Sequence, residues 1–501
     1  MNISETRIAK FIRHPYDLLL LLLLGIPLFF TGVRDIHGWG DDYAQYIKEG
    51  QNIAAGEAYY RSGYIFNPHN PEYAPPSYPP GFPLLLAPVI KFSGLSIRPM
   101  LYLISFMLMI FLLCSYYFYQ RHMSRVSAFC LALIGTYCGA VMDLKPHVLA
   151  DIPLLTFTSL YFLLRIEKPS AIRIFLLSLT ALMAILIRTQ GALLLAAELL
   201  LLITTTIRQL KKREFHGKVF LKNPSLIIVA STLISHQLVS LTVFRAPHQP
   251  YSFYGNLFSL YDHNAWEMLA YNLNYLVDLL RTLLHYVPED FFWQALVTII
   301  EYVSFGFAFA GFLFSLRRMP ELETYFFLLM CLLIFVLPVH QGARYLLPVL
   351  PVYLLYFFRG AKIVMPVLTT NVRSATLLFT ILFLMLGYSH VQAFKEPLAS
   401  HPYNRQDSLA FRYIRENVKD DEIIVFAKPR ALNLYTGKRS VNLAWQKTPA
   451  QNKQFFDSLE VTYLLKRNAL EDEYITQYLA GTAVPSDTII INDEYVMYRV
   501  K

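Results

Sequence analysis

Charged residues are scarce in this sequence, and their scarcity excludes most soluble folds. Asp, Glu, Lys and Arg make up 16% of the 501 residues, and 55% of the residues are hydrophobic. Ordinary soluble domains carry about 25% charged residues. Blocks of like charge, which are typical of disordered chains, are also absent from the sequence. The composition therefore predicts a protein that lies largely within a membrane.

Cysteine is equally scarce, with four residues in the whole chain. They lie within apolar stretches, away from the polar loops where a disulfide would be useful, at positions Cys114, Cys130, Cys138 and Cys331. No two of them have the spacing of a metal-ligand pair. We interpret them as small buried side chains, so they indicate neither a disulfide framework nor a metal centre.

Long apolar segments recur along the chain. A membrane-spanning helix needs about 20 mostly apolar residues, and about eleven such segments are present. They lie near residues 18–33, 98–118, 125–142, 148–165, 172–187, 190–207, 225–244, 292–316, 323–338, 345–359 and 375–390. The first segment has no small-residue cleavage site after it, so we interpret it as a retained span. The pattern predicts an α-helical polytopic membrane protein.

Basic residues set the expected orientation. They concentrate in alternate connections, such as the N-terminal stretch with Arg7 and the stretch "RQLKKREFHGK", and cytoplasmic loops carry such an excess. The N-terminus is therefore predicted to be cytoplasmic, and an odd number of spans puts the C-terminus outside the cytoplasm. Because topology accounts for the net charge of +9, no nucleic-acid partner is expected.

The sequence divides into two predicted domains. Residues 1–392 form the transmembrane domain, with long outer loops at 34–97 and 245–291. The second loop is rich in aromatic residues and is expected to lie along the membrane surface. After residue 392, "RQDSLAFRYIRENVKDDE" is typical of an amphipathic helix, and "IIVFAKP", "VTYLLK" and "DTIIINDEYVMYRV" are typical of strands. Residues 393–501 are therefore predicted to be a small extracytoplasmic α/β domain.

Two adjacent carboxylates begin the first outer loop. In "HGWGDDYAQYIKEG", Asp41 and Asp42 precede a helical pattern with Tyr46 on its apolar face and Gln45 and Glu49 on its polar face. We expect this helix to lie in the membrane interface. Aspartate is a preferred helix N-cap, but a cap needs only one aspartate. Capping and chemistry are therefore both open interpretations of the pair.

Further ionisable residues fall on the same predicted side of the membrane. They occur in "MDLKPHVLADIPLL", "AILIRTQGALLL" and "PVHQGARYLLPVLP", as Asp143, Lys145, His147, Asp151, Arg188 and Arg344. Charges at membrane depth are costly and usually face a polar cavity or a partner. Arginine matches phosphate in geometry and charge, and carboxylates can deprotonate a hydroxyl or hold a divalent cation. The structural alternatives are an N-cap role for Asp151 and snorkelling for the arginines.

An ordered set of motifs in the sequence matches the motifs of a known family. The motifs are Asp42, Tyr46 and Gly56 in the first loop, "PPGFP" at residues 79–83, "DIP" at Asp151, "RTQG" at Arg188 and "RYLLPVLP" at Arg344. Over about residues 10–390 the chain resembles the GT-C membrane glycosyltransferases. The resemblance is to the dolichyl-phosphate-mannose protein mannosyltransferases and the aminoarabinose transferase of lipid A. Tyr78 stands where the lipid A enzyme has a lysine, which weakens lipid A as the acceptor.

The resemblance implies an inverting transfer of a sugar from a polyprenyl-phosphate donor at the extracytoplasmic face of the inner (plasma) membrane. The acceptor is a protein, a lipid or a glycan. Asp42 is the implied base with Asp41 in reserve, and Arg188, Arg344 and Lys145 are the implied phosphate contacts. The other implied site residues are Asp151, Asp143 and His147, for a second acidic or metal site, and Tyr46, Tyr78 and Tyr345, for the substrate cavity. Family members differ in their need for a divalent cation.

Two other functions remain open from the sequence alone. A transporter or flippase of lipid-linked sugars would need acidic residues in mid-span, and Glu198 and Glu301 are the main candidates. A non-catalytic scaffold would bind cell-envelope polymers through the C-terminal domain and would tolerate replacement of both first-loop aspartates.

Overall fold

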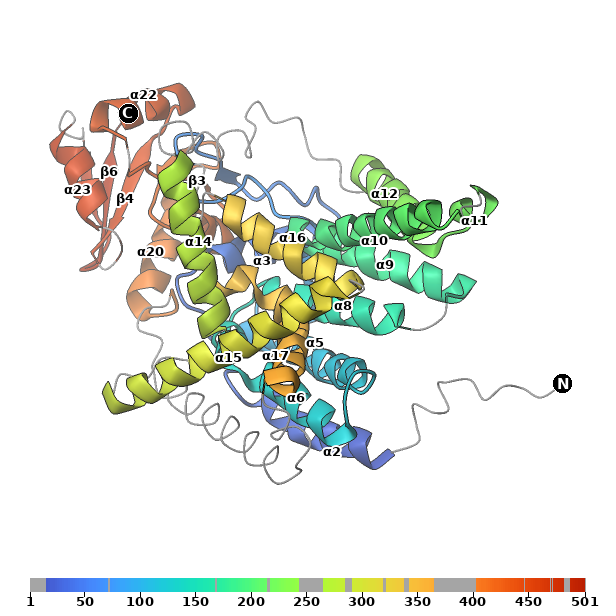
Figure 1. Ribbon diagram of the computed structural model, residues 1–501. Helices are drawn as coiled ribbons and strands as arrows, with labels where there is room; N and C mark the ends of the chain where they lie inside the picture. The colour runs from blue at the N-terminus through green and yellow to red at the C-terminus, as the bar shows by residue number, and fades with distance from the viewer. Residues whose placement is uncertain are drawn as a thin grey trace.

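The computed structural model describes most of the chain. The described residues are 15–70, 73–166, 169–213, 217–242, 265–283, 291–318, 321–337, 342–364, 402–445, 447–468, 470, 472–481 and 487–500. They form a helical body and, at one end of it, a lobe that contains a β-sheet (Figure 1).

The helical body is built from the apolar segments of the sequence. Its α-helices are α2 (Pro15–Gly25), α3 (Asp41–Ala55), α4 (Gly81–Ser93), α5 (Ile97–Tyr119), α6 (Arg125–Tyr137), α7 (Gly139–Leu144), α8 (Asp151–Arg165), α9 (Ala171–Ile187), α10 (Ala192–Lys211), α11 (Gly217–Leu221), α12 (Pro224–Thr242), α14 (Ala265–Thr282), α15 (Phe291–Arg317), α16 (Leu322–Val336) and α17 (Leu350–Val364). Short 3₁₀ turns join several of them: η1 (Ile26–Phe29), η2 (Thr189–Gly191), η4 (Gly342–Tyr345) and η5 (Leu347–Val349). A helix satisfies its own backbone hydrogen bonds, which an apolar solvent requires.

The predicted spans coincide with helices wherever the structure describes them. Among the described residues, 5 helices are long and apolar enough to cross a membrane: Ile97–Tyr119, Thr189–Lys211, Pro224–Thr242, Val297–Arg317 and Leu347–Val364. Other apolar helices, such as Ala171–Ile187 and Leu322–Val336, are shorter. The last predicted span, residues 375–390, lies outside the described residues. The chain is thus a multi-pass helical protein, and the number of eleven spans stays a prediction.

The lobe contains a six-stranded sheet of order β1-β3-β2-β4-β6-β5. Its strands are β1 (Tyr64–Ile65), β2 (Ile423–Val425), β3 (Arg439–Val441), β4 (Tyr463–Arg467), β5 (Asp487–Ile490) and β6 (Tyr495–Arg499). The first four in this order, β1, β3, β2 and β4, are parallel to one another, whereas β6 is antiparallel to both β4 and β5. The helices of this segment are α20 (Arg405–Asn417), α21 (Pro429–Thr436), α22 (Pro449–Leu459) and α23 (Asp472–Ala480).

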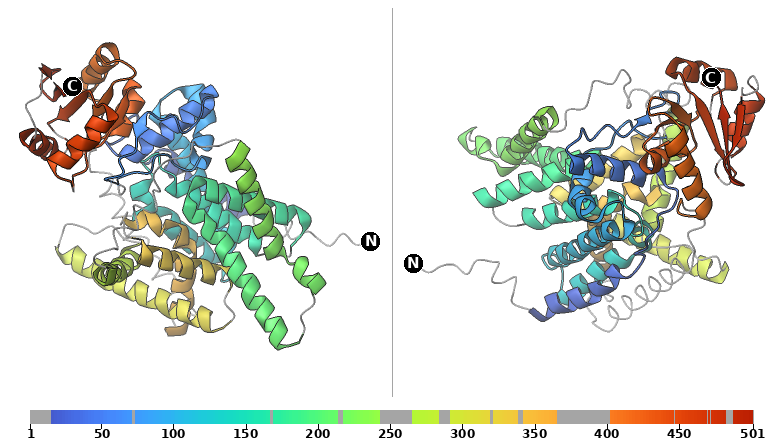
Figure 2. Two further views of the ribbon diagram at one scale, coloured as in Figure 1. Left: turned by 90° about the horizontal axis from the view of Figure 1, so that it is seen from above. Right: turned by 180° about the vertical axis from the view of Figure 1, so that it is seen from behind.

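One strand of this sheet comes from the first outer loop, which the sequence-based division at residue 392 did not anticipate. β1 pairs with β3, and the Ser440 N–H donates to the carbonyl of Gly63 at 3.1 Å. The Asn67 side-chain amide donates to the carbonyl of Asn442 at 2.9 Å. In both views of Figure 2 the blue first-loop segment lies beside the orange and red lobe. The first loop and the C-terminal segment therefore fold together.

The polar face of α3, which the sequence predicts to be an interfacial helix, is largely buried. Gln45 and Glu49, which the sequence pattern places on that face, are buried, and so is Asn52. The reason is that α3 packs against α4 on one side and against α21 of the lobe on the other. Residues of the first loop contact Glu49 and Asn52, and Arg430 of the C-terminal segment contacts Gln45. The periodicity of α3 reveals neither kind of contact.

The junction between the loop and the lobe can be tested at Gly63. Gly63 has a φ of +76°, and a Cβ there would overlap the side-chain amide of Asn433. Gly63→Ala should cost about 1–2 kcal/mol for the left-handed backbone and about 1–3 kcal/mol more for overpacking. Gly56→Ala is the matched control, because Gly56 has a φ of +74° but nothing within 4 Å of a Cβ. Thermal unfolding of the full chain in detergent should show the larger loss for Gly63→Ala, and equal losses would contradict a tight junction.

Candidate active site

Six charged side chains form one continuous row of alternating sign. In order of contact they are Asp41, Arg430, Asp42, Arg344, Asp151 and Arg188. We call this set the charged row. Three carboxylates face three guanidinium groups, so the row is neutral overall. Charges can be buried only when they are paired in this way.

Helix ends position the members of the row. Asp41 and Asp42 are the first residues of α3, and Asp151 is the first residue of α8. A helix N-terminus favours negative charge, which suits these carboxylates. Arg188 directly follows α9, and Arg344 lies in η4. Segments that are far apart in the sequence therefore converge at one end of the helical body.

Asp42 lies at the centre of the row and contacts three donors. The Arg344 Nη1 donates to its Oδ2 at 2.9 Å, and the Arg430 Nη2 donates to its Oδ1 at 2.8 Å. The Tyr78 hydroxyl also donates to Oδ1 at 2.8 Å. The Asp42 side chain is still 23% exposed, so a substrate group can reach it.

These contacts determine the charge of Asp42. Burial acts to raise the pKa of Asp42, but the charges of Arg430 and Arg344 and the hydrogen bond from Tyr78 outweigh it. The pKa of Asp42 is therefore held below its ordinary value. The carboxylate is ionised at neutral pH as long as both arginines remain in contact.

Asp41 has a different environment from its neighbour. Its side chain is 4% exposed and accepts from the Arg430 Nε at 2.9 Å. It also accepts from the backbone N–H groups of Arg430 at 3.3 Å and Ala431 at 2.8 Å. These are free N–H groups in the first turn of α21, whose own N-cap residue, Lys428, makes no side-chain cap. Asp41 therefore caps a helix of the lobe, whereas α3 itself has no side-chain cap.

Asp151 anchors the other end of the row. Its side chain is fully buried and accepts from Arg188 and, at 3.3 Å, from the Arg344 Nε. Arg188 also lies over the ring of Tyr345, at 5.7 Å from its centroid. Both arginines thus turn inward to Asp151 rather than snorkelling to the membrane surface. The most exposed members of the row are Asp42 and Arg344, at 23% and 21%.

Aromatic side chains line the row. The rings of Tyr46 and Tyr78 stack with their centroids 4.3 Å apart, and the Tyr78 hydroxyl contacts Asp42. Tyr78 precedes the "PPG" element, whose Gly81 packs against the backbone of Leu186 so closely that a Cβ would overlap it. The glycine therefore brings the start of α4 against the end of α9, next to Arg188.

His37 links the first loop to the segment before Asp151. Its Nε2 accepts from the Val148 N–H at 3.1 Å, and its ring stacks on Tyr43. Burial lowers the pKa of His37 to about 3, with a further contribution from His147. His37 is therefore neutral at physiological pH and acts as a fixed connection, which the sequence analysis did not identify.

The remaining predicted site residues lie outside the row. Lys145 is buried and its Nζ donates to the carbonyl of Thr31. Asp143 is exposed, and His147 packs edge-on against His37. Within the described ranges, no three or more His, Cys, Asp or Glu side chains are grouped so as to hold a metal ion. The carboxylates of the row are all paired with arginines, so the residues present do not fit a divalent cation.

Arg430 is the member that the sequence analysis missed. It belongs to "KPRALNLYTG", in which a proline at the first helical position marks the start of α21. That signal predicts a helix but gives no indication of a partner nearly four hundred residues earlier in the chain.

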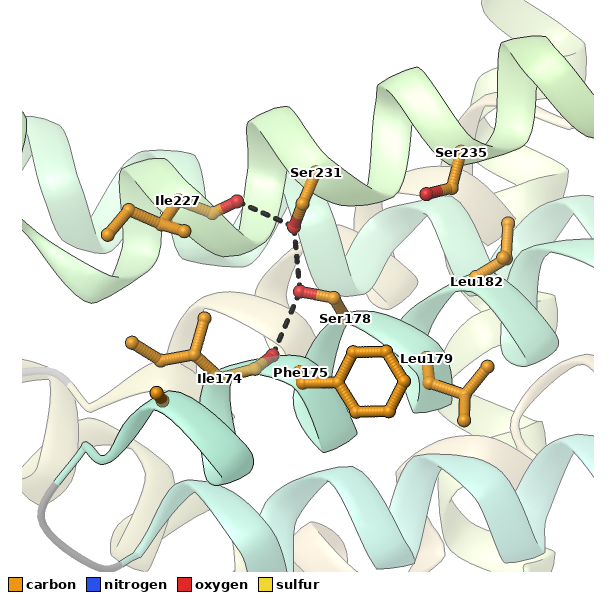
Figure 3. A pocket seen from close by; sticks show the side chains of 9 residues that line it. Ile174, Phe175, Ser178, Leu179, Leu182, Ile227, Ser231 and Ser235 are labelled. Atoms are coloured by element: carbon orange, nitrogen blue, oxygen red, sulfur yellow. Dashed lines mark hydrogen bonds between the residues drawn. The ribbon is translucent and has the colours of Figure 1, made fainter.

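A separate groove lies between α9 and α12. It has a volume of about 420 Å³ and is lined mainly by apolar side chains such as Phe175, Leu179 and Leu182. Ser178 and Ser231 point toward each other across it, with their hydroxyl oxygens 2.8 Å apart (Figure 3). None of the members of the charged row lines this groove.

Comparison with known proteins establishes the fold. No protein-family model and no curated protein sequence matches the chain. Its structure is similar to that of ArnT from Cupriavidus metallidurans bound to undecaprenyl phosphate, with a TM-score of 0.55, 13% identity and 98% of each chain covered. It is also similar to the apo oligosaccharyltransferase of Archaeoglobus fulgidus, with a TM-score of 0.58, 12% identity, and 95% and 72% of the two chains covered. The resemblance to the GT-C proteins is thereby confirmed at the level of the fold.

The burial of Glu49 on α3, next to the charged row, can be tested through its effect on stability. It is fully buried, and burial raises its pKa to about 8 despite hydrogen bonds from the Tyr78 N–H and Gln45. The folded protein keeps this proton at pH values where the unfolded chain has lost it. Stability should therefore fall by about 1.4 kcal/mol per pH unit as the pH rises from the unfolded to the folded pKa.

Glu49→Gln carries a neutral amide in place of the protonated acid and should remove this dependence. Thermal unfolding between about pH 5 and pH 8 should show a flatter profile for Glu49→Gln than for the wild type. The exposed Glu57→Gln is the control and should keep the wild-type slope. Identical slopes for all three proteins would mean that Glu49 is ionised in the folded state.

Proposed function

We propose that the protein is an integral-membrane glycosyltransferase that moves a sugar from a polyprenyl-phosphate donor to an acceptor, with inversion, at the extracytoplasmic face. The observation that carries the proposal is the contact between Asp42 and Arg344 in the exposed middle of the charged row. A base and a phosphate-binding cation must belong to the same site if one bound sugar is to be within reach of both.

The class of donor is supported by what the similar proteins bind. ArnT from Cupriavidus metallidurans is bound to undecaprenyl phosphate, and an archaeal oligosaccharyltransferase structure contains dolichol-phosphate, with a TM-score of 0.52 to this chain. Apolar helices flank the charged row in this chain, α9 ending at Arg188 and the apolar segment of η5 and α17 following Arg344. A lipid tail in the membrane would thus present its phosphate to the arginines.

The reaction that we propose is a single displacement. Arg344 and Arg188 bind the phosphate of the donor and stabilise the charge that develops on it as it leaves. The acceptor O–H or N–H gives its proton to Asp42, and the acceptor atom forms a bond to the anomeric carbon. The bond between that carbon and the phosphate oxygen breaks, and the polyprenyl phosphate leaves with the electron pair. Attack from the face opposite the phosphate inverts the anomeric centre.

Donor binding would also prepare the base. Asp42 and Asp151 both contact Arg344, and the charges of Arg430 and Arg344 keep the pKa of Asp42 below its ordinary value. A phosphate that takes over Arg344 weakens its contact with Asp42, so the pKa of Asp42 rises. A base is most effective when its pKa is near the working pH. The exchange therefore couples the basicity of Asp42 to the presence of the donor.

The orientation follows the distribution of basic residues. With the N-terminus in the cytoplasm, the first loop and the sheet-containing lobe lie on the extracytoplasmic side of the inner membrane. The charged row then lies at the outer boundary, where a donor head group and an acceptor protein, lipid or glycan can meet.

Replacement of Asp42 tests the base. Asp42→Asn should lower sugar transfer by about 10²–10⁴-fold, because the amide cannot accept the acceptor proton. The assay is turnover of a polyprenyl-phosphate sugar by purified protein in lipid. Asp35→Asn is the control, since Asp35 lies in the same loop but makes an exposed ion pair with Arg98. Unchanged turnover by Asp42→Asn would exclude Asp42 as the base.

Replacement of Arg344 tests the phosphate contact. Arg344→Gln should weaken binding of undecaprenyl phosphate by about 10- to 100-fold, which is the usual effect of losing a charged hydrogen bond. The dissociation constant can be measured by titration of the protein in nanodiscs. Arg359→Gln is the control, because Arg359 is a half-buried arginine that contacts Ser315 and Glu321 instead of the row. Equal affinities for the two variants would remove Arg344 from the donor site.

A further inference from the structure

The lobe contributes one side chain to the charged row. Arg430 is 2% exposed and lies between Asp41 and Asp42, with its Nε on the first and its Nη2 on the second. Its Nη1 donates to the Tyr78 hydroxyl at 2.9 Å and to the Gln45 Oε1 at 3.0 Å. Each nitrogen of the guanidinium group thus has an acceptor from the first loop.

We propose that Arg430 is a positioning residue for Asp42, supplied by the C-terminal segment, which holds the carboxylate with its Oδ1 inward and its Oδ2 toward Arg344. This inference rests on the proposed function, because it assigns a purpose to Arg430 only if Asp42 is the base. It adds to that function a role for the lobe, which supplies one residue of the active site.

Arg430 is itself held from several sides. Its guanidinium lies 5.6 Å from the ring centroids of Tyr73 and Tyr78 and 5.9 Å from that of Tyr64. Asp41 contacts both its side chain and its backbone N–H. A planar guanidinium with five fixed donors can bridge two carboxylates, whereas the single ammonium of lysine cannot do so with the same geometry. The position of Arg430 is therefore set by groups of the chain itself.

The contact fixes which oxygen of Asp42 faces the substrate. Oδ1 is occupied by Arg430 and Tyr78, and Oδ2 contacts Arg344, the cation proposed to exchange with the phosphate. Without Arg430 the carboxylate is free to rotate and to pair with Arg344 through both oxygens. In that geometry Asp42 would keep Arg344 from binding the phosphate, and the base would be turned away from the acceptor.

The same contact keeps Asp42 charged. The titratable and charged groups around it come from several elements, and they are Asp41 and Tyr46 on α3, Tyr78 before α4, Asp151 on α8, Arg344 and Tyr345 in η4, and Arg430 on α21. Arg430 and Arg344 are the cations that oppose the burial of Asp42. Removal of Arg430 leaves burial opposed by one cation, which moves the protonation of Asp42 to higher pH.

The test measures the protonation of Asp42 directly in the full chain. Carbodiimide labels protonated carboxyl groups, and Asp42 is exposed enough to react, whereas Asp41 is buried. Peptide mass spectrometry gives the pH midpoint of labelling for the protein in nanodiscs. In Arg430→Gln this midpoint should rise by about 1–3 pH units. In Arg430→Lys, which keeps a cation but cannot bridge both carboxylates, it should be intermediate.

Arg467→Gln is the matched control for a loss of folding stability alone. Arg467 is a buried arginine of the same lobe that pairs with Asp407 and lies over the Trp39 ring. This variant should lower the unfolding temperature and leave the labelling midpoint of Asp42 unchanged. The inference is overturned if neither Arg430 variant shifts the midpoint, or if Arg467→Gln shifts it as much as Arg430→Gln does.

Sugar transfer provides the second readout. The acid limb of the kcat/KM profile should move with the labelling midpoint, and Arg430→Lys should lower kcat more than it raises KM. The two proposals fail separately, because labelling needs no donor. Full activity of Asp42→Asn would refute the assignment of Asp42 as the base. An unshifted labelling midpoint of Asp42 in Arg430→Gln and Arg430→Lys would refute the positioning role of Arg430.

Discussion

The ion pairs of Arg430 with Asp41 and Asp42 join the two parts of this protein, and the arrangement of the charged row depends on them. A buried guanidinium without its carboxylates would cost several kcal/mol, as would buried carboxylates without the guanidinium. The geometry in which the first loop and the lobe pair these charges is therefore strongly favoured over other ways of docking. Strand β1 adds backbone pairing at the same junction.

The two adjacent aspartates have distinct environments although they are neighbours on one helix. Asp41 is buried, caps α21 and holds Arg430, so its contacts are structural. Asp42 is partly exposed and lies between two arginines from different segments. Successive residues of a helix point about 100° apart. One carboxylate can therefore serve the junction while the other stays partly exposed beside Arg344.

The neutrality of the row suits its place at the end of apolar helices. Each arginine is matched by a carboxylate, so the row places no unpaired charge beside the apolar helices. In the proposed reaction, the donor phosphate exchanges with a carboxylate for the same guanidinium.

The sequence by itself determined the helical, membrane-spanning character of the chain, because apolar runs and turn residues are local signals. The motifs also predicted Asp42, Asp151, Arg188 and Arg344 as site residues, since charges beside apolar segments are conspicuous, and these four lie together in the row. Only the tertiary structure decided that Gln45 and Glu49 are buried, that Lys145 lies away from the row and that Arg430 lies within it. These outcomes depend on which surfaces pack together, and pairings between residues far apart in the chain leave no mark on the local pattern.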